Sequence, residues 1–315
     1  MGTIFRKELS DHFTSTRFVI TFALILMVSV VTTYLAGANL RTALEGVAKP
    51  SHVFLLLFTT SGQFFSLVQF IAFFGPLIGI LLGFDAINRE RNDNTLSKLI
   101  AQPIFRDAVI NGKFLAGVTT IAILLTSTVL LISGLGLLTI GVVPGGDEWG
   151  RLAVYVAVSV AYISFWMGLA ILFSIVFRSL ATSALASVAV WIFFAFFIGF
   201  AASLVANVIA PVENPRDSRQ MLAYRNAEDA ASLASPVVLY TQATSSILDP
   251  FRRARQNVTL VGPLEKFSME RFRNPLPLDQ SIFVVLPYLT LMLGLTVVCF
   301  GLSYVVFLRQ EIRSG

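Results

Sequence analysis

The sequence predicts an all-α polytopic membrane protein with six transmembrane helices. Of its 315 residues 56% are hydrophobic and only 13% are charged, whereas an average soluble domain has about 25% charged residues. Six windows contain no Asp, Glu, Lys, Arg or His: 18–40, 53–84, 114–146, 152–177, 179–212 and 280–308. Each window exceeds the roughly 20 residues that a helix needs to cross about 30 Å of hydrocarbon. A helix satisfies its own backbone hydrogen bonds in lipid, and the alternating pattern of a membrane barrel is absent.

The basic residues predict the orientation in the membrane. Six spans bring both termini, loop 85–113 and Arg178 to one side, which then holds eleven Lys and Arg residues against three in the opposite short loops. Basic residues in short loops favour the cytoplasmic side. We therefore expect a multi-pass protein of a prokaryotic cytoplasmic membrane with both termini in the cytoplasm. This topology accounts for the net charge of +5, so we expect no nucleic-acid partner.

Residues 1–17 precede the first span. Apolar residues recur there at the spacing of an amphipathic helix: Ile4, Phe5, Leu9 and Phe13. Such a helix is expected to lie in the cytoplasmic interface against membrane lipid, and a polar leader with scattered apolar residues is the alternative. A cleaved signal peptide is a second alternative for the first span, because residues 36–38 resemble a cleavage site. The apolar run 18–35 is longer than the usual run of about 7–15 residues, which argues against cleavage.

The spans carry none of the residues on which most membrane enzymes and ion-coupled transporters depend. Both histidines, His12 and His52, lie outside the charge-free windows, and Cys299 is the only cysteine. No carboxylate lies within a span to bind a driving ion, and no Cys and His cluster offers metal ligands. We therefore expect no catalytic residue, no metal site and no cofactor in this chain.

A phosphate-binding loop is also missing. The nearest match, residues 111–114, lacks both the earlier glycine and the Ser or Thr that follow lysine in such a loop. Energy for uphill transport would then come from a separate ATPase subunit, and the loop at 85–113 is where that subunit is expected to dock.

The second span, about 64–84, contains two patterns. Small residues at four-residue spacing predict close helix packing, within the chain in preference to a dimer: Gly75, Gly79 and Gly83. Polar residues recur every three positions near its other end: Gln63, Ser66 and Gln69. This polar stripe either lines a water-accessible pathway or hydrogen-bonds neighbouring helices.

The fifth span, about 184–207, is rich in aromatic residues. Three of them are candidates for a hydrophobic wall of a pathway: Trp191, Phe194 and Phe197. Because aromatic residues surround this helix, contact with lipid or ordinary packing is the alternative. Neither long window, 53–84 nor 179–212, carries a central turn signal, so each is expected to provide one span.

The chain therefore divides into four parts. Residues 18–210 contain the first five spans, and residues 282–315 contain the sixth span and a cytoplasmic tail. Between them, residues 211–281 hold seven of the twelve prolines together with nine basic and eight acidic residues. This composition, with its helix-like patches, predicts a small extracytoplasmic helical subdomain between spans five and six.

The loop 85–113 carries the densest short run of charge. Residues 92–94 interrupt the helix that continues from the second span and offer N-caps for a new one. Leu96, Leu99 and Ile100 form one apolar face, and Pro103 ends the helix after about two turns. A helix this short is unstable alone in water, so it is expected to lie against the membrane surface or in a groove of another protein.

The stretch FDAINRERNDNTLSKLIAQPIFRDAVINGKFLAG resembles the permease subunits of type-2 ABC exporters. The matching positions are Glu90, Arg91, Thr95, Leu96, Pro103, Arg106, Gly112, Lys113 and Phe114, whereas Asn94 stands where the family often has glycine. The segments LASPVVLYTQATSSILDP and FLRQEIR are similar to the branch that contains the permease of the nitrous oxide reductase maturation system.

This resemblance implies a permease that works as a dimer with two ATPase subunits, which would bind ATP and magnesium. It implies a pathway between the second and fifth spans of both copies. The residues expected to couple to the ATPase are Glu90, Arg91, Thr95, Leu96, Leu99, Ile100, Pro103 and Arg106. The alternative is a mechanotransmitting subunit that acts on an extracytoplasmic protein without moving cargo.

Overall fold

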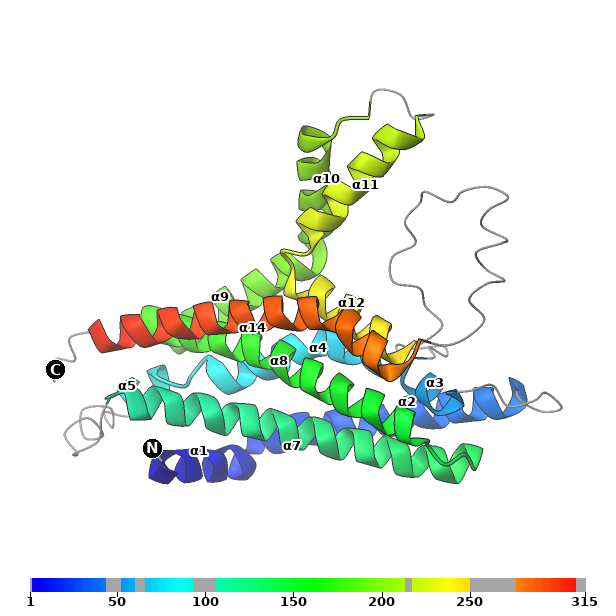
Figure 1. The fold of residues 1–315 in the computed structure, drawn as a ribbon. Coiled ribbons are helices and arrows are strands. Elements are labelled where there is room, and N and C mark those ends of the chain that lie inside the picture. The colour runs from blue at the N-terminus through cyan, green and yellow to red at the C-terminus, as the bar shows by residue number, and fades with distance from the viewer. Residues whose placement is uncertain are drawn as a thin grey trace.

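The computed structural model describes residues 2–43, 52–59, 66–92, 106–212, 217–249 and 276–309. In these ranges the chain is helical and has no strand (Figure 1). Six helical stretches are long and apolar enough to cross a membrane: Thr16–Thr42, Leu67–Asn92, Asp107–Ile140, Gly146–Val176, Leu180–Ile209 and Leu278–Arg309. The prediction of an all-α polytopic membrane protein is confirmed.

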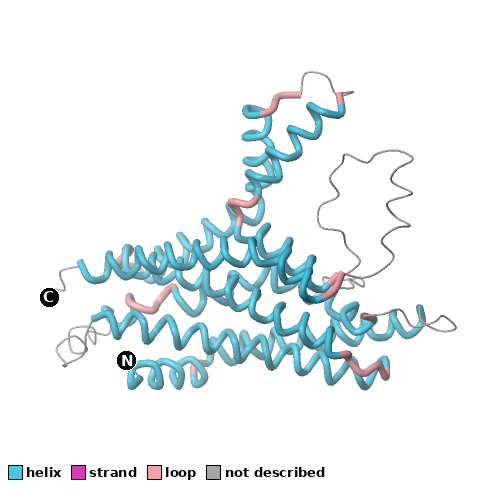
Figure 2. Tube along the Cα trace, viewed as in Figure 1, coloured by secondary structure: helices cyan, strands magenta, loops and turns pink. Residues whose placement is uncertain are grey.

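The helices follow one another with short connections in the described ranges (Figure 2). Their order is α1 (Gly2–Thr14), α2 (Thr16–Ala43), α3 (Val53–Thr59), α4 (Leu67–Gly83), α5 (Asn88–Asn92), α7 (Arg106–Ile140), α8 (Gly146–Val176), α9 (Leu180–Ile192), the π-helical turn η1 (Phe193–Phe197), α10 (Ile198–Ile209), α11 (Ser218–Ser232), α12 (Pro236–Leu248) and α14 (Leu278–Arg309). The start of α1 and the end of α14 lie at one end of the bundle, which we call the terminal end (Figure 1). The opposite end is called the far end.

Helix α8 is the centre of the bundle and packs against α4, α7, α9, α12 and α14. The three glycines of the second span make the α4–α8 contact close. A Cβ atom at Gly83 would lie 2.5 Å from the carbonyl oxygen of Met167, and one at Gly79 would overlap the carbonyl oxygen of Ile163. Gly75 faces the Ile163 side chain. The small residues therefore serve packing within the chain, because any side chain at Gly79 or Gly83 would push α8 away.

The charge-free window 53–84 contains two helices. The short helix α3 ends at Thr59, and five of its seven residues are buried: Val53, Phe54, Leu55, Leu57 and Phe58. Helix α4 begins at Leu67 after the N-cap Ser66 and is the part of the window that crosses the bundle. One span from this window is what the sequence predicts, and α3 adds a cover to the bundle near the far end (Figure 1).

The sequence predicts one span over about 184–207, but the chain bends within this range. Helix α9 packs on α8 and α4, but α10 leaves the bundle after the π-helical turn η1 and packs on α11 (Figure 1). A π-helical turn is a recognised cause of a sharp helix bend. The chain returns at Ser235, whose hydroxyl lies 3.5 Å from the carbonyl oxygen of Phe194. Helix α12 then continues toward the far end.

The segment between the fifth and sixth spans is helical, but its two described helices go to different places. Helix α11 packs on α10, outside the bundle, whereas α12 packs on α14, α8 and α4. The buried face of α12 includes Leu239, Tyr240, Ala243 and Ile247. The segment is therefore not one compact unit in its described part, because the apolar face of α12 is buried against the spans. Residues 250–275 lie outside the described ranges.

The close α4–α8 contact predicts how a larger residue at Gly79 changes the stability of the protein. We expect Gly79→Ala to lower the free energy of unfolding by about 1–3 kcal/mol, because the added methyl group overlaps the α8 backbone. Gly294→Ala is the matched control, since a Cβ atom there has no neighbour within 4 Å. Thermal unfolding of the detergent-solubilised protein measures both. Equal melting temperatures for the two variants would contradict the close packing.

Candidate functional site

A cluster of four charged side chains, Lys7, Glu8, Glu90 and Lys113, lies at the terminal end of the bundle and is called the charge junction. It is built where α1 packs lengthwise on the first part of α7. Ile4 is buried there, and a Cβ atom at Gly112 would lie 2.9 Å from its Cγ2 atom. Glu8 lies one helical turn after Ile4, and Lys113 follows Gly112. The glycine thus lets α1 approach closely enough for Glu8 and Lys113 to meet.

The ammonium group of Lys113 stands between two carboxylates. Its Nζ atom is 2.7 Å from Oε1 of Glu8 and 3.3 Å from Oε1 of Glu90. The side chains of Lys113, Glu8 and Glu90 are only 8%, 12% and 12% exposed. Lys7, which is 55% exposed, lies 3.6 Å from the same Glu90 oxygen. The junction therefore has two positive and two negative charges and joins α1, α5 and α7.

Hydrogen bonds from α8 and α9 hold α5 in place. The hydroxyl oxygen of Ser174 accepts from the backbone N–H groups of Ile87 and Asn88 at 3.0 and 3.1 Å. On α9, the hydroxyl of Ser183 donates to the carbonyl oxygen of Phe84 at 2.9 Å. These bonds satisfy backbone groups where α4 ends, so the turn leading into α5 is fixed to the two neighbouring helices.

A further ion pair lies beside the junction. Nη1 of Arg17, at the start of α2, is 3.0 Å from Oδ2 of Asp85, and the guanidinium lies over the ring of Phe84. Burial lowers the pKa of His12 on α1, Lys113 lowers it further, and Glu8 opposes the shift. The lowered pKa favours the neutral form of His12.

The predicted coupling residues fall into two groups. Glu90 and Arg91 lie in α5, and the Arg91 guanidinium donates to Oδ1 of Asn88 at 3.4 Å. Arg106 is the first residue of α7, but its side chain lies outside the described part. The others also lie outside the described ranges: Thr95, Leu96, Leu99, Ile100 and Pro103.

Sequence reasoning missed Glu8 and Lys7 as members of the same cluster. A signal was present for Glu8, because it lies four residues after Ile4 on the side of α1 that packs on α7. Lys113 entered the sequence analysis through the Gly-Lys-Phe match and the incomplete phosphate-binding loop, with no partner predicted for it. Its partners are 23 and 105 residues away in sequence, so only the fold brings them together.

The structure gives Ser66 and Gln69 a local role. They form a capping box at the start of α4, in which the Gln69 N–H donates to the Ser66 hydroxyl and the Gln69 side chain accepts from the Ser66 N–H. This arrangement satisfies two orphan donors of the helix terminus. Gln63 lies outside the described ranges.

The three aromatic pathway candidates do not share one surface. Trp191 is buried and packs edge-on against Phe73 of α4, and Phe194 packs against Trp166 of α8. Phe197 is 54% exposed at the bend where α10 departs. Trp191 and Phe194 therefore hold α9 and η1 against the bundle, while Phe197 faces outward.

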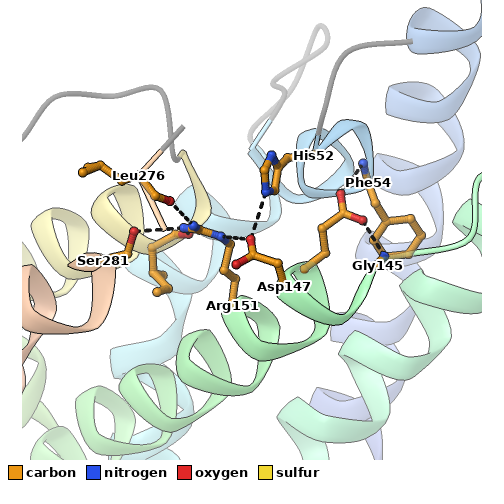
Figure 3. Close-up of polar contacts among 9 residues, drawn as sticks. His52, Phe54, Gly145, Asp147, Arg151, Leu276 and Ser281 are labelled. Carbon is orange, nitrogen blue, oxygen red and sulfur yellow. Dashed lines mark hydrogen bonds and ion pairs between the residues drawn. The ribbon is translucent and has the colours of Figure 1, made fainter. Parts of the chain in front are cut away.

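A second polar cluster fixes the far end (Figure 3). Arg151 of α8 is fully buried, and its guanidinium donates to Asp147 Oδ2, the Ser281 hydroxyl and the carbonyl oxygens of Ile247 and Leu276. His52 Nε2 lies 2.9 Å from Asp147 Oδ2. Arg151 thus ties α8 to the end of α12 and the start of α14, and Asp147 connects it to His52, the residue before α3. Five donors in a rigid fork suit this bridging role.

The described residues contain no group of three or more His, Cys, Asp or Glu side chains placed to hold a metal ion. The charge junction joins α5, which precedes residues 93–105, to α7, which follows them. The junction therefore links the two helices that flank this segment.

A match to a known protein family covers the whole bundle. The family model described as ABC-2 family transporter protein matches residues 2–312. A search of curated proteins finds no significant match. The family match spans every described helix, so it includes the charge junction, the far-end cluster and the sixth span as well as the motif around Glu90.

The burial of Lys113 predicts that its removal destabilises the protein. Lys113→Met should lower the free energy of unfolding by about 3–5 kcal/mol, because it leaves two nearly buried carboxylates without their shared partner. Lys7→Met removes an exposed lysine from the same cluster and should cost less than about 1 kcal/mol. Unfolding in a denaturing detergent titration compares the two. Similar losses would show that the buried position of Lys113 has no special weight.

Proposed function

This chain belongs to the ABC-2 family of transporter proteins, and we propose that it is the permease subunit of an ATP-driven exporter whose ATPase docks at the terminal end. As a family member it is a membrane component of an ABC transporter and works with an ABC ATPase. The finer assignments, which are the docking surface, the dimer, the orientation and the direction of transport, are our proposal.

The observation that carries the proposal is the position of the charge junction. Residues 93–105, which include the predicted two-turn helix, connect α5 to α7. Glu90 on α5 and Lys113 on α7 are 3.3 Å apart and nearly buried. Helices α5 and α7, the two stems of this docking segment (residues 93–105), are therefore bonded to each other and to Glu8 of α1. A load applied by an ATPase to the segment would move α4 and α7 together, because both stems share one ion-pair cluster.

The position of residues 111–114 supports ATP binding by a partner. Residues 111–114 lie inside helix α7, whereas a phosphate-binding loop must precede a helix so that its backbone N–H groups surround the phosphates. ATP and magnesium are accordingly assigned to the ATPase subunit. Two copies of the ATPase would serve two copies of this permease.

Side chains fill the interior of one copy, and this supports a pathway between two copies. Tyr162 and Tyr240 stack between α8 and α12 with ring centroids 4.3 Å apart, and the Tyr162 hydroxyl donates to the Ala72 carbonyl oxygen of α4 at 2.7 Å. Trp166 beside them is fully buried. Because these side chains fill the space between α4, α8 and α12, we propose that cargo moves along the interface between the α4 and α9 surfaces of two protomers.

The orientation follows from charge. We propose that the terminal end faces the cytoplasm of a prokaryotic cell, since the basic residues of the short connections gather on that side. The likeness to the nitrous oxide reductase maturation branch rests on two segments and stays a prediction. A partner protein at the far end also stays a prediction.

Two variants test the coupling role. Leu99→Asp should release the ATPase that copurifies with the wild-type chain, because a charge on the apolar face of the docking helix opposes burial in a groove. Glu90→Gln should keep the ATPase bound but lower permease stimulation of ATP hydrolysis about tenfold, since the link between α5 and α7 is lost. Copurification and ATPase rates in lipid nanodiscs measure the two effects.

Glu228→Gln on α11 is the control, because it makes the same chemical change far from the charge junction and should leave both readouts at wild-type values. If the Leu99→Asp variant retained both the bound ATPase and its stimulation, the docking role of residues 93–105 would be wrong. Normal stimulation in Glu90→Gln would remove the junction from the coupling pathway.

A further inference from the structure

The helices α10 and α11 form a hairpin, called the arm, that projects from the side of the bundle. In Figure 1 both helices run steeply across the direction of α7, α8 and α14. Helix α10 packs on α11 and η1, and among the described residues neither helix has an extended contact with another span. The hydroxyl of Tyr224 on α11 lies 3.5 Å from the carbonyl oxygen of Ser203 on α10. The arm is thus a two-helix unit with its own packing.

The two sides of α10 differ in chemistry. Ala202 and Ala206 are buried, and their spacing of four places them on one side of the helix. Small residues at this spacing allow two helices to approach closely, so this side serves the contact with α11. The exposed surface carries one polar residue, Asn207, and is otherwise dominated by bulky apolar residues: Phe200, Leu204, Val205, Val208 and Ile209. Val208 is 83% exposed and Phe200 67%.

Helix α11 is polar where α10 is apolar. It has no buried residue, and its exposed positions include Arg219, Arg225, Asn226 and Asp229. In Figure 1 it lies on the far-end side of α10. The arm as a whole therefore presents an apolar layer toward the terminal end and a charged layer toward the far end.

We propose that the arm lies flat in the membrane interface on the far-end side, with α10 in the boundary between headgroups and acyl chains and α11 toward water. An amphipathic unit that runs across the spans and separates apolar from charged residues has the geometry of an interfacial anchor. The charges of α11 exclude a position deep in the hydrocarbon.

Lipid suits the exposed face of α10 better than a second copy of this chain does. Helices that pack in membranes meet through small residues, and α10 already uses its small residues for α11. The exposed face is two rows wide, with Leu204 beside Val205 and Val208 beside Ile209, so bulky side chains prevent close helix contact along most of it. A wide, bulky face of this kind is what acyl chains cover.

The arm also changes the account of the fifth crossing. From Leu180 to Phe197 the chain has 18 helical residues, which span roughly 27 Å at about 1.5 Å per residue. This length nearly matches a hydrocarbon core of about 30 Å. The crossing is thus completed by α9 and η1, and the bend at η1 marks the depth at which the chain turns along the membrane surface.

Spin-label accessibility tests the proposal on the full chain in nanodiscs. Replacing Cys299 by Ser removes the only native cysteine, and single cysteines are then placed at Phe200, Leu204 and Val208 on α10 and at Arg225 on α11. Collision rates with oxygen, which partitions into lipid, and with a water-soluble nickel chelate report the environment of each label. We expect the α10 labels to favour oxygen at least fivefold, at one common depth, and the Arg225 label to favour nickel.

A label at Leu185 on α9 serves as the depth reference. A depth that changes by about 6 Å between successive α10 labels would instead indicate a continuing span and overturn the proposal. Low access of both reagents to the α10 labels would show that a second protein chain covers the face. Nickel access equal to that at Arg225 would place the whole arm in water. None of these outcomes depends on an ATPase, so the result is separate from the proposed transport function.

Discussion

The nearly buried ammonium group of Lys113 is the interaction on which the terminal end of this protein depends. It meets Glu8 of α1 and Glu90 of α5 at 2.7 and 3.3 Å. Charges removed from water must be paired, and losing one partner of such a cluster costs far more than losing an exposed ion pair. The three helices α1, α5 and α7 are consequently held in one arrangement, although 105 residues of chain separate Glu8 from Lys113.

The two ends of the bundle use different chemistry for the same purpose. At the far end Arg151 is the hub, and three of its partners are a hydroxyl and two backbone carbonyl oxygens. These three acceptors carry no net charge. At the terminal end the partners of Lys113 are carboxylates on two other helices, and the attraction between the ammonium group and each carboxylate depends on the distance between them. In our proposal the terminal end is where a docked ATPase changes the arrangement of the spans, while the far end holds α8, α12 and α14 together.

Several elements could be predicted because their physical cause is local in the sequence. Charge-free windows located the spans, since ionised groups are costly in lipid, and the spacing of Gly75, Gly79 and Gly83 indicated a close helix contact. The Ser66 and Gln69 pair was also readable, because Ser-x-x-Gln is a capping signal, yet it was interpreted as a polar stripe. The departure of α10 had no such signal. The sequence FFAFF at η1 contains neither proline nor glycine, and only the packing of Trp191 and Phe194 against the bundle shows where α9 stops following it. The partners of Arg151 were unpredictable for a similar reason, because two of them are backbone atoms 96 and 125 residues away.

The most direct test of the account is a double-mutant cycle between Glu90 and Lys113, with permease-stimulated ATP hydrolysis as the readout. Glu90→Gln, Lys113→Met and the double variant are compared in nanodiscs at equal protein amounts. If the two side chains act as one link between the stems of the docking segment, the double variant should lose no more stimulation than Lys113→Met alone, with a coupling free energy of about 1–3 kcal/mol. Losses that simply add, with a coupling free energy near zero, would show that the two residues act separately and would contradict the central role of the charge junction.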